Sequence, residues 1–302
     1  MKKTMETRIF CKVCGSDNIS GFGKVTNGNY PADFLEKYTI LNCEECLFKF
    51  IYPTPTDEAI NFIYSGTEYS QWEIVDKTNK TISTRYLNFK YYAEIISTYK
   101  KSGKVLDCGC ATGLFLDIMK DGGFDCFGVE ISNTPYSIVE KKHPNKIFRQ
   151  EIENLKIDDG FFDIITMFDF IEHVKDPRQV IDKANKLLSD GGLLFIITPD
   201  TSSLSASIMG KSHNDYIMEH LGLFNKKNIT YFLDKYGFEI LKIQPAKKII
   251  NLDFVEKVFK RHTNIIYYPI NFLNRLLPKK VAQIPIKLSF GGMFIVAKKR
   301  NS

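Results

Sequence analysis

Residues 105–113 read Val-Leu-Asp-Cys-Gly-Cys-Ala-Thr-Gly, an apolar run that passes directly into a stretch of small residues. The apolar part predicts a buried strand, and the apolar spacing from Leu114 to Met119 predicts that a helix follows. A small-residue loop between a strand and a helix lets a ligand approach backbone N–H groups, and the helix N-terminus favours an anionic group there. The spacing is D-x-G-x-A-x-G, which differs from the dinucleotide pattern G-x-G-x-x-G. This stretch therefore predicts an α/β fold with a ligand site where the strand ends.

Short β-rich runs and helical patterns alternate from residue 103 onward, which predicts a parallel sheet covered by helices on both faces. The further predicted strands are 124–130, 162–168, 193–198, 238–243 and 293–297. The predicted helices cover 83–99, a segment that begins at Asp176-Pro177 and stops at Gly191-Gly192, and 225–236.

Glu130 stands at the end of the second predicted strand, 17 residues past Gly113. An acid at this place fits the two hydroxyls of a ribose, as in other nucleoside-binding α/β folds. The alternative is an ordinary exposed carboxylate. Loop and acid together indicate a nucleoside-containing ligand more strongly than the glycine loop alone.

Four motifs in order carry a resemblance to a known family. They are residues 105–113, then Glu130, then Phe162-Asp-Ile-Ile-Thr-Met-Phe-Asp-Phe-Ile-Glu-His-Val-Lys-Asp-Pro177, then Gly191-Gly-Leu-Leu-Phe-Ile-Ile-Thr-Pro199. This order resembles a class I S-adenosylmethionine (SAM)-dependent methyltransferase, in particular the branch related to the ubiquinone-biosynthesis O-methyltransferases. The resemblance implies a Rossmann-like sheet of seven strands with helices on both faces, whose last strand runs antiparallel.

The resemblance also implies which residues bind SAM. The methionine moiety would be lined by the first motif, the ribose held by Glu130 and the adenine flanked by Ile131 and by Glu151-Ile152, with Phe168 and Asp169 closing the pocket. The full expected set is Asp107, Gly109, Ala111, Gly113, Glu130, Ile131, Glu151, Ile152, Phe168 and Asp169. A glycine commonly stands where this chain has Ala111, and an alanine excludes only a strongly positive φ.

Two C-x2-C pairs near the N-terminus predict a metal site. Cys11-Lys-Val-Cys14 and Cys43-Glu-Glu-Cys46 are separated by 28 residues, and four thiolates arranged in this way suit tetrahedral zinc. With all four ligands from protein the zinc would be structural, and it would stabilise a segment too small to fold comfortably alone. The alternative is four unrelated buried or redox cysteines. Cys108, Cys110 and Cys126 lie in apolar runs and are expected in the core.

Two segments offer a base for methyl transfer. His173 follows the strand at 162–168, where related O-methyltransferases use an acidic Glu-His segment, in some members to hold a divalent cation. The segment after the fifth strand carries His220, with Glu219 to orient it and Tyr216 to hydrogen-bond the acceptor; sugar C-methyltransferases have a similar cluster there. We expect His220 to be the base and His173 to brace the structure, although His220 could instead anchor the helix that follows.

Charge and composition limit the partners that the chain could have. The chain has 302 residues and a net charge of +6, but residues 241–302 hold thirteen Lys and Arg against Asp253 and Glu256. This basic segment could meet an anionic membrane, a phosphorylated substrate or RNA, or could be a solvated face; we expect no DNA partner. No apolar run is long enough to span a membrane, and seven cysteines without a secretion signal indicate a reducing compartment, so a cytoplasmic location is expected.

The expected organisation is a zinc ribbon (1–55), a linker with N-terminal helices (56–102) and a SAM-dependent methyltransferase domain (103–302). A lid-like insertion at 246–289 would cover the substrate or contact a membrane surface. The expected function is methyl transfer to a small-molecule acceptor, on a hydroxyl or acidic carbon of a sugar or related metabolite, sugar-linked or lipid-linked. The alternatives are a zinc-ribbon RNA methyltransferase and a non-catalytic, zinc-stabilised binding module.

Overall fold

Seven strands form the central sheet of the computed structural model, which describes residues 8–25, 30–65, 84–251, 268, 271–272 and 284–301. The strand order is β10-β11-β8-β7-β4-β5-β6. The strands are β4 (Lys104–Cys108), β5 (Asp125–Val129), β6 (Ile147–Phe148), β7 (Phe162–Phe168), β8 (Leu188–Pro199), β10 (Phe238–Ile250) and β11 (Ile286–Lys299). The strands from β4 to β8 pair in parallel, and β11 pairs antiparallel with both β8 and β10. The predicted seven-stranded sheet with an antiparallel last strand is thereby confirmed.

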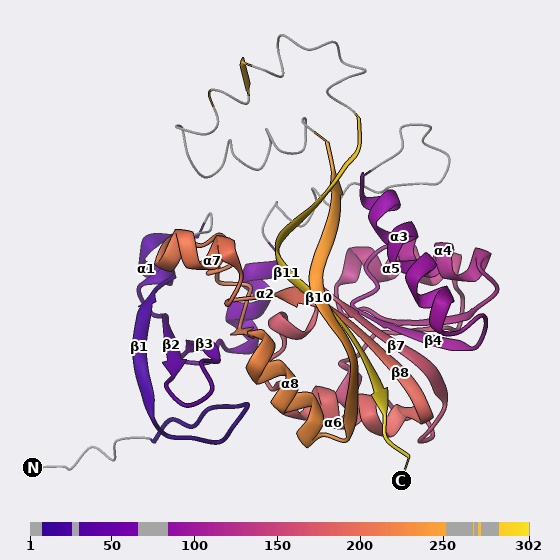
Figure 1. Ribbon diagram of the computed structural model, residues 1–302, viewed down its shortest axis with the longest axis horizontal. Helices are drawn as coiled ribbons and strands as arrows, with labels where there is room; N and C mark the ends of the chain where they lie inside the picture. Colours follow the sequence, from indigo (N-terminus) through magenta and orange to yellow (C-terminus); the bar gives the residue numbers. More distant parts are fainter. Residues whose placement is uncertain are drawn as a thin grey trace, which may run out of the picture.

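Helices cover both faces of this sheet, as Figure 1 shows. They are α3 (Thr84–Tyr99), α4 (Leu114–Asp121), α5 (Asn133–Lys142), α6 (Pro177–Leu187) and α8 (Lys226–Lys235). Neighbouring strand residues face opposite layers: Val105 joins the core with α3 and α4, whereas Leu106 joins the core with α6 and α8. Because successive strand side chains alternate, a run apolar at every position is buried on both faces.

A local signal sets the start of α6 but not its end. Asp176 caps α6 by accepting from Arg178 N, and Pro177 occupies its first turn, as predicted. The helix was expected to stop at Gly191-Gly192, but it ends at Leu187 and β8 starts at the next residue. The expectation was wrong because burial of Leu187 and Leu188 continues the chain straight into the sheet, so the glycine pair lies inside β8.

The N-terminal segment forms a second, four-stranded sheet in the order β1-β2-β3-β9. Its elements are β1 (Ile19–Lys24), α1 (Ala32–Leu35), β2 (Thr39–Cys43), β3 (Lys49–Tyr52) and β9 (Gly222–Leu223), and α2 (Asp57–Ser65) follows it. The first three strands come from the predicted ribbon and pair antiparallel. The fourth comes from the methyltransferase segment, so the two predicted domains share one sheet.

The predicted insertion at 246–289 is shorter than expected. Residues up to Ile250 continue β10 and residues from Ile286 belong to β11, which pair from Lys247↔Ser289 to Ile250↔Ile286. Figure 1 shows these strands running past the sheet as an arm. Most of the residues between the two strands lie outside the described part of the chain, and so does the choice between lid and membrane contact. Within the described ranges no helix has both the length and the apolar character to cross a bilayer.

A short helix and three single turns complete the architecture. Helix α7 (Leu204–Met209) packs near β11 and is capped by Ser203, whose side chain accepts from Ala206 N. The 3-10 turns are η2 (Ile152–Asn154), η3 (Ile171–His173) and η4 (Gly210–Ser212). Turns η2 and η3 follow the carboxyl ends of β6 and β7, so both lie at the edge of the sheet where doubly wound folds bind ligands.

Candidate functional site

The loop between β4 and α4 has an unusual backbone. Gly109, Ala111 and Gly113 have φ values of +76°, +47° and +81°. A side chain at Gly113 would also meet Val139 Cγ2 at 2.6 Å. Ala111 therefore adopts the left-handed region that its side chain disfavours, but with a smaller φ than the two glycines. A left-handed non-glycine residue costs on the order of 1–2 kcal/mol, and such strain is typical of ligand-binding loops.

Glu130 reaches from the end of β5 back to this loop. Its Oε2 accepts from Ala111 N at 3.0 Å and its Oε1 accepts from Ser132 N at 2.7 Å. The side chain is 5% exposed, and this burial raises its pKa against the lowering effect of the backbone hydrogen bonds. A carboxylate has about four acceptor positions, so Glu130 can also accept from two ribose hydroxyls. The residues present therefore fit a nucleoside at this edge.

Asp107 lies beneath the loop as a buried carboxylate. Its Oδ1 accepts from Thr166 Oγ1 of β7 at 2.6 Å. Burial, aided by the nearby Glu130 charge and opposed by the Thr166 hydrogen bond, raises the pKa of Asp107 to about 7. A carboxylic acid that titrates near neutrality at a strand end is typical of a functional site.

The other expected cofactor residues occupy the same edge with different exposures. Ile131 is 51% exposed beside Glu130, Glu151 is exposed at the start of η2, and Ile152 is fully buried. Phe168 packs against Phe115 and Tyr92 rather than standing open, with ring centroids 5.1 and 5.5 Å apart. Asp169 is exposed with a φ of +49° and donates its N–H to Ile197 O.

His173 and His220 meet edge to face, with ring centroids 4.9 Å apart. His173 Nδ1 donates to the Glu219 carbonyl at 2.9 Å, and His220 Nδ1 donates to the Asp215 carbonyl at 2.8 Å. These bonds place the proton on Nδ1 and the lone pair on Nε2. Burial lowers the pKa of His173 to about 3 and that of His220 to about 4, so both rings are neutral at pH 7.

Acidic groups and a lysine surround the histidine pair. Glu172 is buried, accepts from Thr198 Oγ1 at 3.0 Å, and has its pKa raised by burial and by the Asp169 charge. Burial also raises the pKa of Asp215, while the charge of Asp169 raises the pKa of Lys248. One ligand atom each from Glu172, His173 and His220 lies within 4.8 Å of the others, a spacing that could hold a divalent cation.

Glu219 and Tyr216 face the ribbon. Glu219 Oε1 accepts from Tyr30 OH at 2.6 Å, so its carboxylate does not orient His220 as expected; its carbonyl instead holds His173. Tyr216 is 3% exposed and packs on Phe22 of β1, with centroids 5.0 Å apart. Burial raises the pKa of Tyr216 to about 12. These two residues shape the loop that carries His220.

The four N-terminal cysteines come together as predicted. Cys11 Sγ lies 3.6 Å from Cys46 Sγ, and Cys14 Sγ lies 3.5 Å from Cys43 Sγ. Zinc bound tetrahedrally at about 2.3 Å would separate its sulfurs by about 3.8 Å, so the group fits zinc. A hydrogen bond from the Cys46 thiol lowers the pKa of Cys11 to about 5. The other three cysteines are buried as expected.

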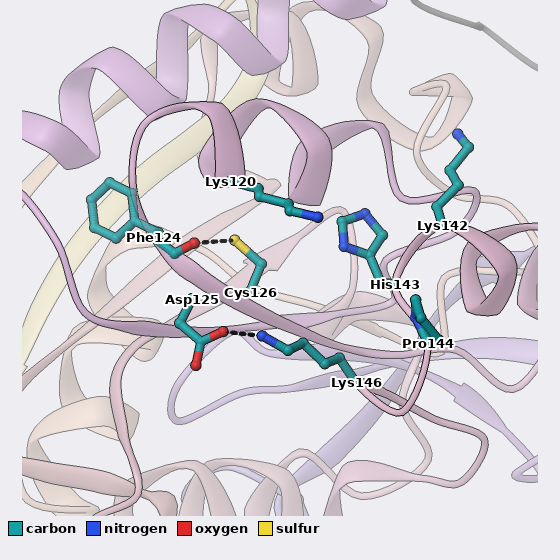
Figure 2. A pocket seen from close by; sticks show the side chains of 8 residues that line it. All are labelled: Lys120, Phe124, Asp125, Cys126, Lys142, His143, Pro144 and Lys146. Carbon is teal, nitrogen blue, oxygen red and sulfur yellow. Dashed lines mark hydrogen bonds and ion pairs between the residues drawn. The ribbon is translucent and has the colours of Figure 1, made fainter.

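A cavity of about 260 Å³ lies elsewhere, at the amino end of β5. Figure 2 shows its basic lining, with Lys146 directed at Asp125. His143 is held by Asp117 at 2.9 Å and Lys142 contacts Asp117 at 3.6 Å. The cavity lies at the opposite end of the strand from Glu130, and much of its positive charge is already matched by carboxylates, so we assign it no part in the site.

Two residues of this region were not predicted from the sequence. Lys248 comes from β10, far outside the motifs, and Tyr30 comes from the ribbon. No periodicity or spacing points to either, because each reaches its partners only through the packing of distant segments. The charge run after residue 241 was the one available signal for Lys248.

Comparison with known proteins gives a family match. A family model described as a methyltransferase domain matches residues 83–243, more than half of the 302 residues. The ubiquinone biosynthesis O-methyltransferase of Coxiella burnetii is 30% identical over 140 residues, which cover 45% of this chain and 59% of that protein. That of Pectobacterium carotovorum is 26% identical over 173 residues, covering 55% of this chain and 67% of that protein. The chain thus matches little more than half the length of the first of these relatives.

Solved structures share the fold at low identity. A SAM-dependent methyltransferase from Thermotoga maritima superposes with a TM-score of 0.52 and 20% identity, covering 80% of this chain and 99% of that one. The cyclase SpnF superposes with a TM-score of 0.54 and 14% identity, covering 82% of this chain and 98% of SpnF. At these identities the likeness concerns the fold alone, which serves more than one reaction.

Proposed function

Because this chain belongs to the methyltransferase domain family, we propose that it transfers the methyl group of SAM to a hydroxyl of a small-molecule acceptor. The curated relatives are named as O-methyltransferases, and they support oxygen rather than carbon as the nucleophile. The single observation that carries the proposal is the position of Glu130, whose carboxylate bonds the amide of Ala111 in the glycine loop. Loop and acid lie at the edge of the sheet where the two ends of a nucleoside ligand would be held.

The residues of the first motif and Glu130 would bind the cofactor. SAM supplies an activated methyl group on a sulfonium, so the protein contributes position and a base. The first turn of α4, whose N-cap Gly113 supplies no side-chain acceptor, would direct its backbone N–H groups at the carboxylate end of SAM, and Glu130 would accept from the ribose hydroxyls. Glu151 and Ile131 would flank the adenine from η2 and from the end of β5.

His220 is the proposed base. With Nδ1 donating to the Asp215 carbonyl, its Nε2 would accept the proton of the acceptor hydroxyl as the oxygen takes the methyl group. Because the pKa of His220 is about 4, the ring is neutral and ready to accept a proton throughout the neutral range. The charge of Asp169 favours the imidazolium that forms. His173 would brace the loop through the Glu219 carbonyl.

The surface near the arm supports one class of acceptor. Ile284, just before β11, is 53% exposed, and Ile286 and Leu288 at the start of β11 are 52% and 44% exposed on either side of Lys287. Apolar side chains among lysines suit the headgroup region of an anionic membrane. We therefore propose a lipid-linked acceptor, with a sugar or related polar head that carries the hydroxyl.

Calorimetry with SAM and with its demethylated product tests the cofactor assignment. Wild type and the exposed-site control Glu94→Ala should bind both compounds, whereas Glu130→Ala should bind each at least about tenfold more weakly, the loss expected for charged hydrogen bonds. Absence of heat with folded wild-type protein would contradict the proposal.

Flotation with vesicles of anionic and of neutral lipid tests the acceptor class. Binding to anionic vesicles that weakens in Ile286→Glu would support it. Salt-sensitive binding to RNA without binding to vesicles would favour the RNA methyltransferase instead. Mass spectrometry of lipid extracts incubated with isotopically labelled SAM would then identify the methylated product.

A further inference from the structure

The loop that carries His220 is held by the N-terminal ribbon. Strand β9 pairs antiparallel with β3, with Lys49 opposite Leu223 and Phe50 opposite Gly222. The amide of Ile51 donates to the Leu221 carbonyl at 3.1 Å, which extends the pairing by one bond. Pairing is close enough that a side chain at Gly222 would meet the Phe48 ring at 2.7 Å. The loop therefore enters the ribbon sheet as its edge strand.

The second cysteine pair is clamped by the start of α8. Asn225 and Asn228 form a reciprocal capping box, and both are buried. Their side-chain amides also donate to the Cys46 carbonyl, at 3.3 and 3.1 Å. A buried amide without an acceptor is costly, so the position of the Cys43–Cys46 pair and the position of α8 depend on each other.

Tyr30 and Glu219 join the ribbon to the histidine pair. Tyr30 OH donates to Glu219 Oε1 at 2.6 Å, while the carbonyl of the same Glu219 accepts from His173 Nδ1 at 2.9 Å. Glu219 Oε2 is buried and has no hydrogen-bond donor among the described residues. Among the described residues, the Tyr30 hydroxyl is thus the donor that the Glu219 carboxylate has. Glu219 therefore links the ribbon to His173.

Apolar packing supports the same connection. Met218, Leu221 and Leu223 share a buried cluster with Ile40 and Ile51 of the ribbon. A ribbon that lost its metal would lose the knuckles that hold β2 and β3 in register, because so small a unit depends on metal for much of its stability. The loop would then lose its neighbouring strand and its apolar partners together.

We propose that the four-cysteine ribbon is the positioning element of the acceptor side of the site, with Tyr30 as a positioning residue. Tyr30 holds Glu219, the backbone of Glu219 holds His173, and the ring of His173 sets the place of His220. The geometry of the histidine pair therefore depends on the metal that the four cysteines of the ribbon would bind. The inference rests on the proposed function only where it calls this loop the acceptor side.

Hydrogen exchange on the full-length, zinc-loaded protein tests this proposal. Tyr30→Phe removes one hydroxyl, and Tyr38→Phe is the matched control because Tyr38 packs on Phe34 in the same aromatic group. In Tyr30→Phe we expect the amides of 215–224 to exchange at least about tenfold faster, with residues 105–113 unchanged. Tyr38→Phe should leave both segments near wild type. Removal of zinc from the wild-type protein by a chelator should accelerate exchange of the amides of 215–224 more than Tyr30→Phe does.

Nitrogen-15 labelling of the five histidines supplies a signature that simple loss of stability would not produce. The ring nitrogens of His173 should report a protonated Nδ1 in wild type and in Tyr38→Phe, and a mixture of tautomers in Tyr30→Phe. Equal exchange and equal ring signals in all three proteins, or in zinc-loaded and zinc-free protein, would overturn the proposal. Calorimetry with SAM on the same samples reports the cofactor site separately, since Tyr30→Phe should leave its affinity unchanged.

Discussion

Replacement of Asp107 by asparagine should stabilise the protein at pH 8 and much less at pH 5. Asparagine keeps an oxygen that can accept from Thr166 Oγ1, but it removes a charge that burial makes costly. In the folded chain Asp107 has a pKa of about 7, against about 3.9 in an unfolded chain. Between these values the folded state holds a proton that the unfolded state has released, so wild-type stability falls as pH rises.

The size of the effect follows from the same pKa. Each pH unit in this window is worth about 1.4 kcal/mol, and about two units separate pH 5 from the pKa of the folded state. The difference in unfolding free energy between Asp107→Asn and wild type should therefore rise by roughly 3 kcal/mol from pH 5 to pH 8. Any packing cost of the new amide is the same at both pH values and cancels.

Urea unfolding of the cofactor-free proteins at the two pH values measures this difference. Asp163→Asn is the matched control, because Lys100 and the amide of Lys104 hydrogen-bond Asp163 and lower its pKa despite some burial. Asp163 is thus ionised in both the folded and the unfolded state over this range. Asp163→Asn should therefore change the unfolding free energy by the same amount at pH 5 and pH 8. A pH-independent difference for Asp107→Asn would refute the assignment of a buried, near-neutral carboxyl beneath the cofactor loop.

Four further predictions concern the base, the cofactor loop and the metal. His220→Ala should lower kcat by 10²-fold or more, the usual loss of a general base, while calorimetry shows unchanged SAM affinity. His173→Ala should lower kcat less. A larger loss of kcat in His173→Ala would exchange the roles of the two histidines. The rate should stay flat from pH 8 to about 5.5 and fall below that, as His220 gains a proton near pH 4; a fall centred near 6.5 would exclude this environment for the base. Gly113→Ala should destabilise by about 2–3 kcal/mol in thermal or urea unfolding, because its side chain would meet Val139 at 2.6 Å at a φ of +81°. Cys43→Ser should reduce bound zinc measured by metal analysis and lower the unfolding temperature of the ribbon; full zinc content would show that other ligands hold the metal.

The strained residues mark the site independently of the motifs. Among the described residues, Ala111 and Asp169 are two of the four non-glycine residues with positive φ, and each follows a central strand, β4 or β7. Strand order reverses between these two strands, since β5 lies beyond β4 on one side and β8 beyond β7 on the other. Ligands of doubly wound sheets bind at this reversal. Two strained backbones at that place indicate that the loops are shaped for a ligand.

Local patterns identified most of the central strands and most of the helices that cover them, but neither α5 nor β6, and not all of the ends. Asp176-Pro177 identified the start of α6, because capping acts within one turn. The predicted end of α6 at Gly191-Gly192 was wrong, because burial of Leu187 and Leu188 in the sheet sets the end of that helix. The insertion was overestimated for a similar reason: β10 and β11 continue their pairing to Ile250 and Ile286, and the sequence there, rich in lysine, carries no clear alternation.

Local patterns were enough to predict the class of fold, the loop and acid at the carboxyl ends of the strands, and the cysteine site. Periodicity, capping and ligand spacing act over a few residues, so Gly109, Glu130 and the four cysteines could be found without coordinates. The packing of distant segments sets which side chains surround His220 and joins the loop at 213–224 to the ribbon sheet. Those contacts join residues nearly two hundred positions apart, Tyr30 with Glu219 among them. They arise when separate apolar faces are buried against one another, and no local pattern specifies which faces will meet.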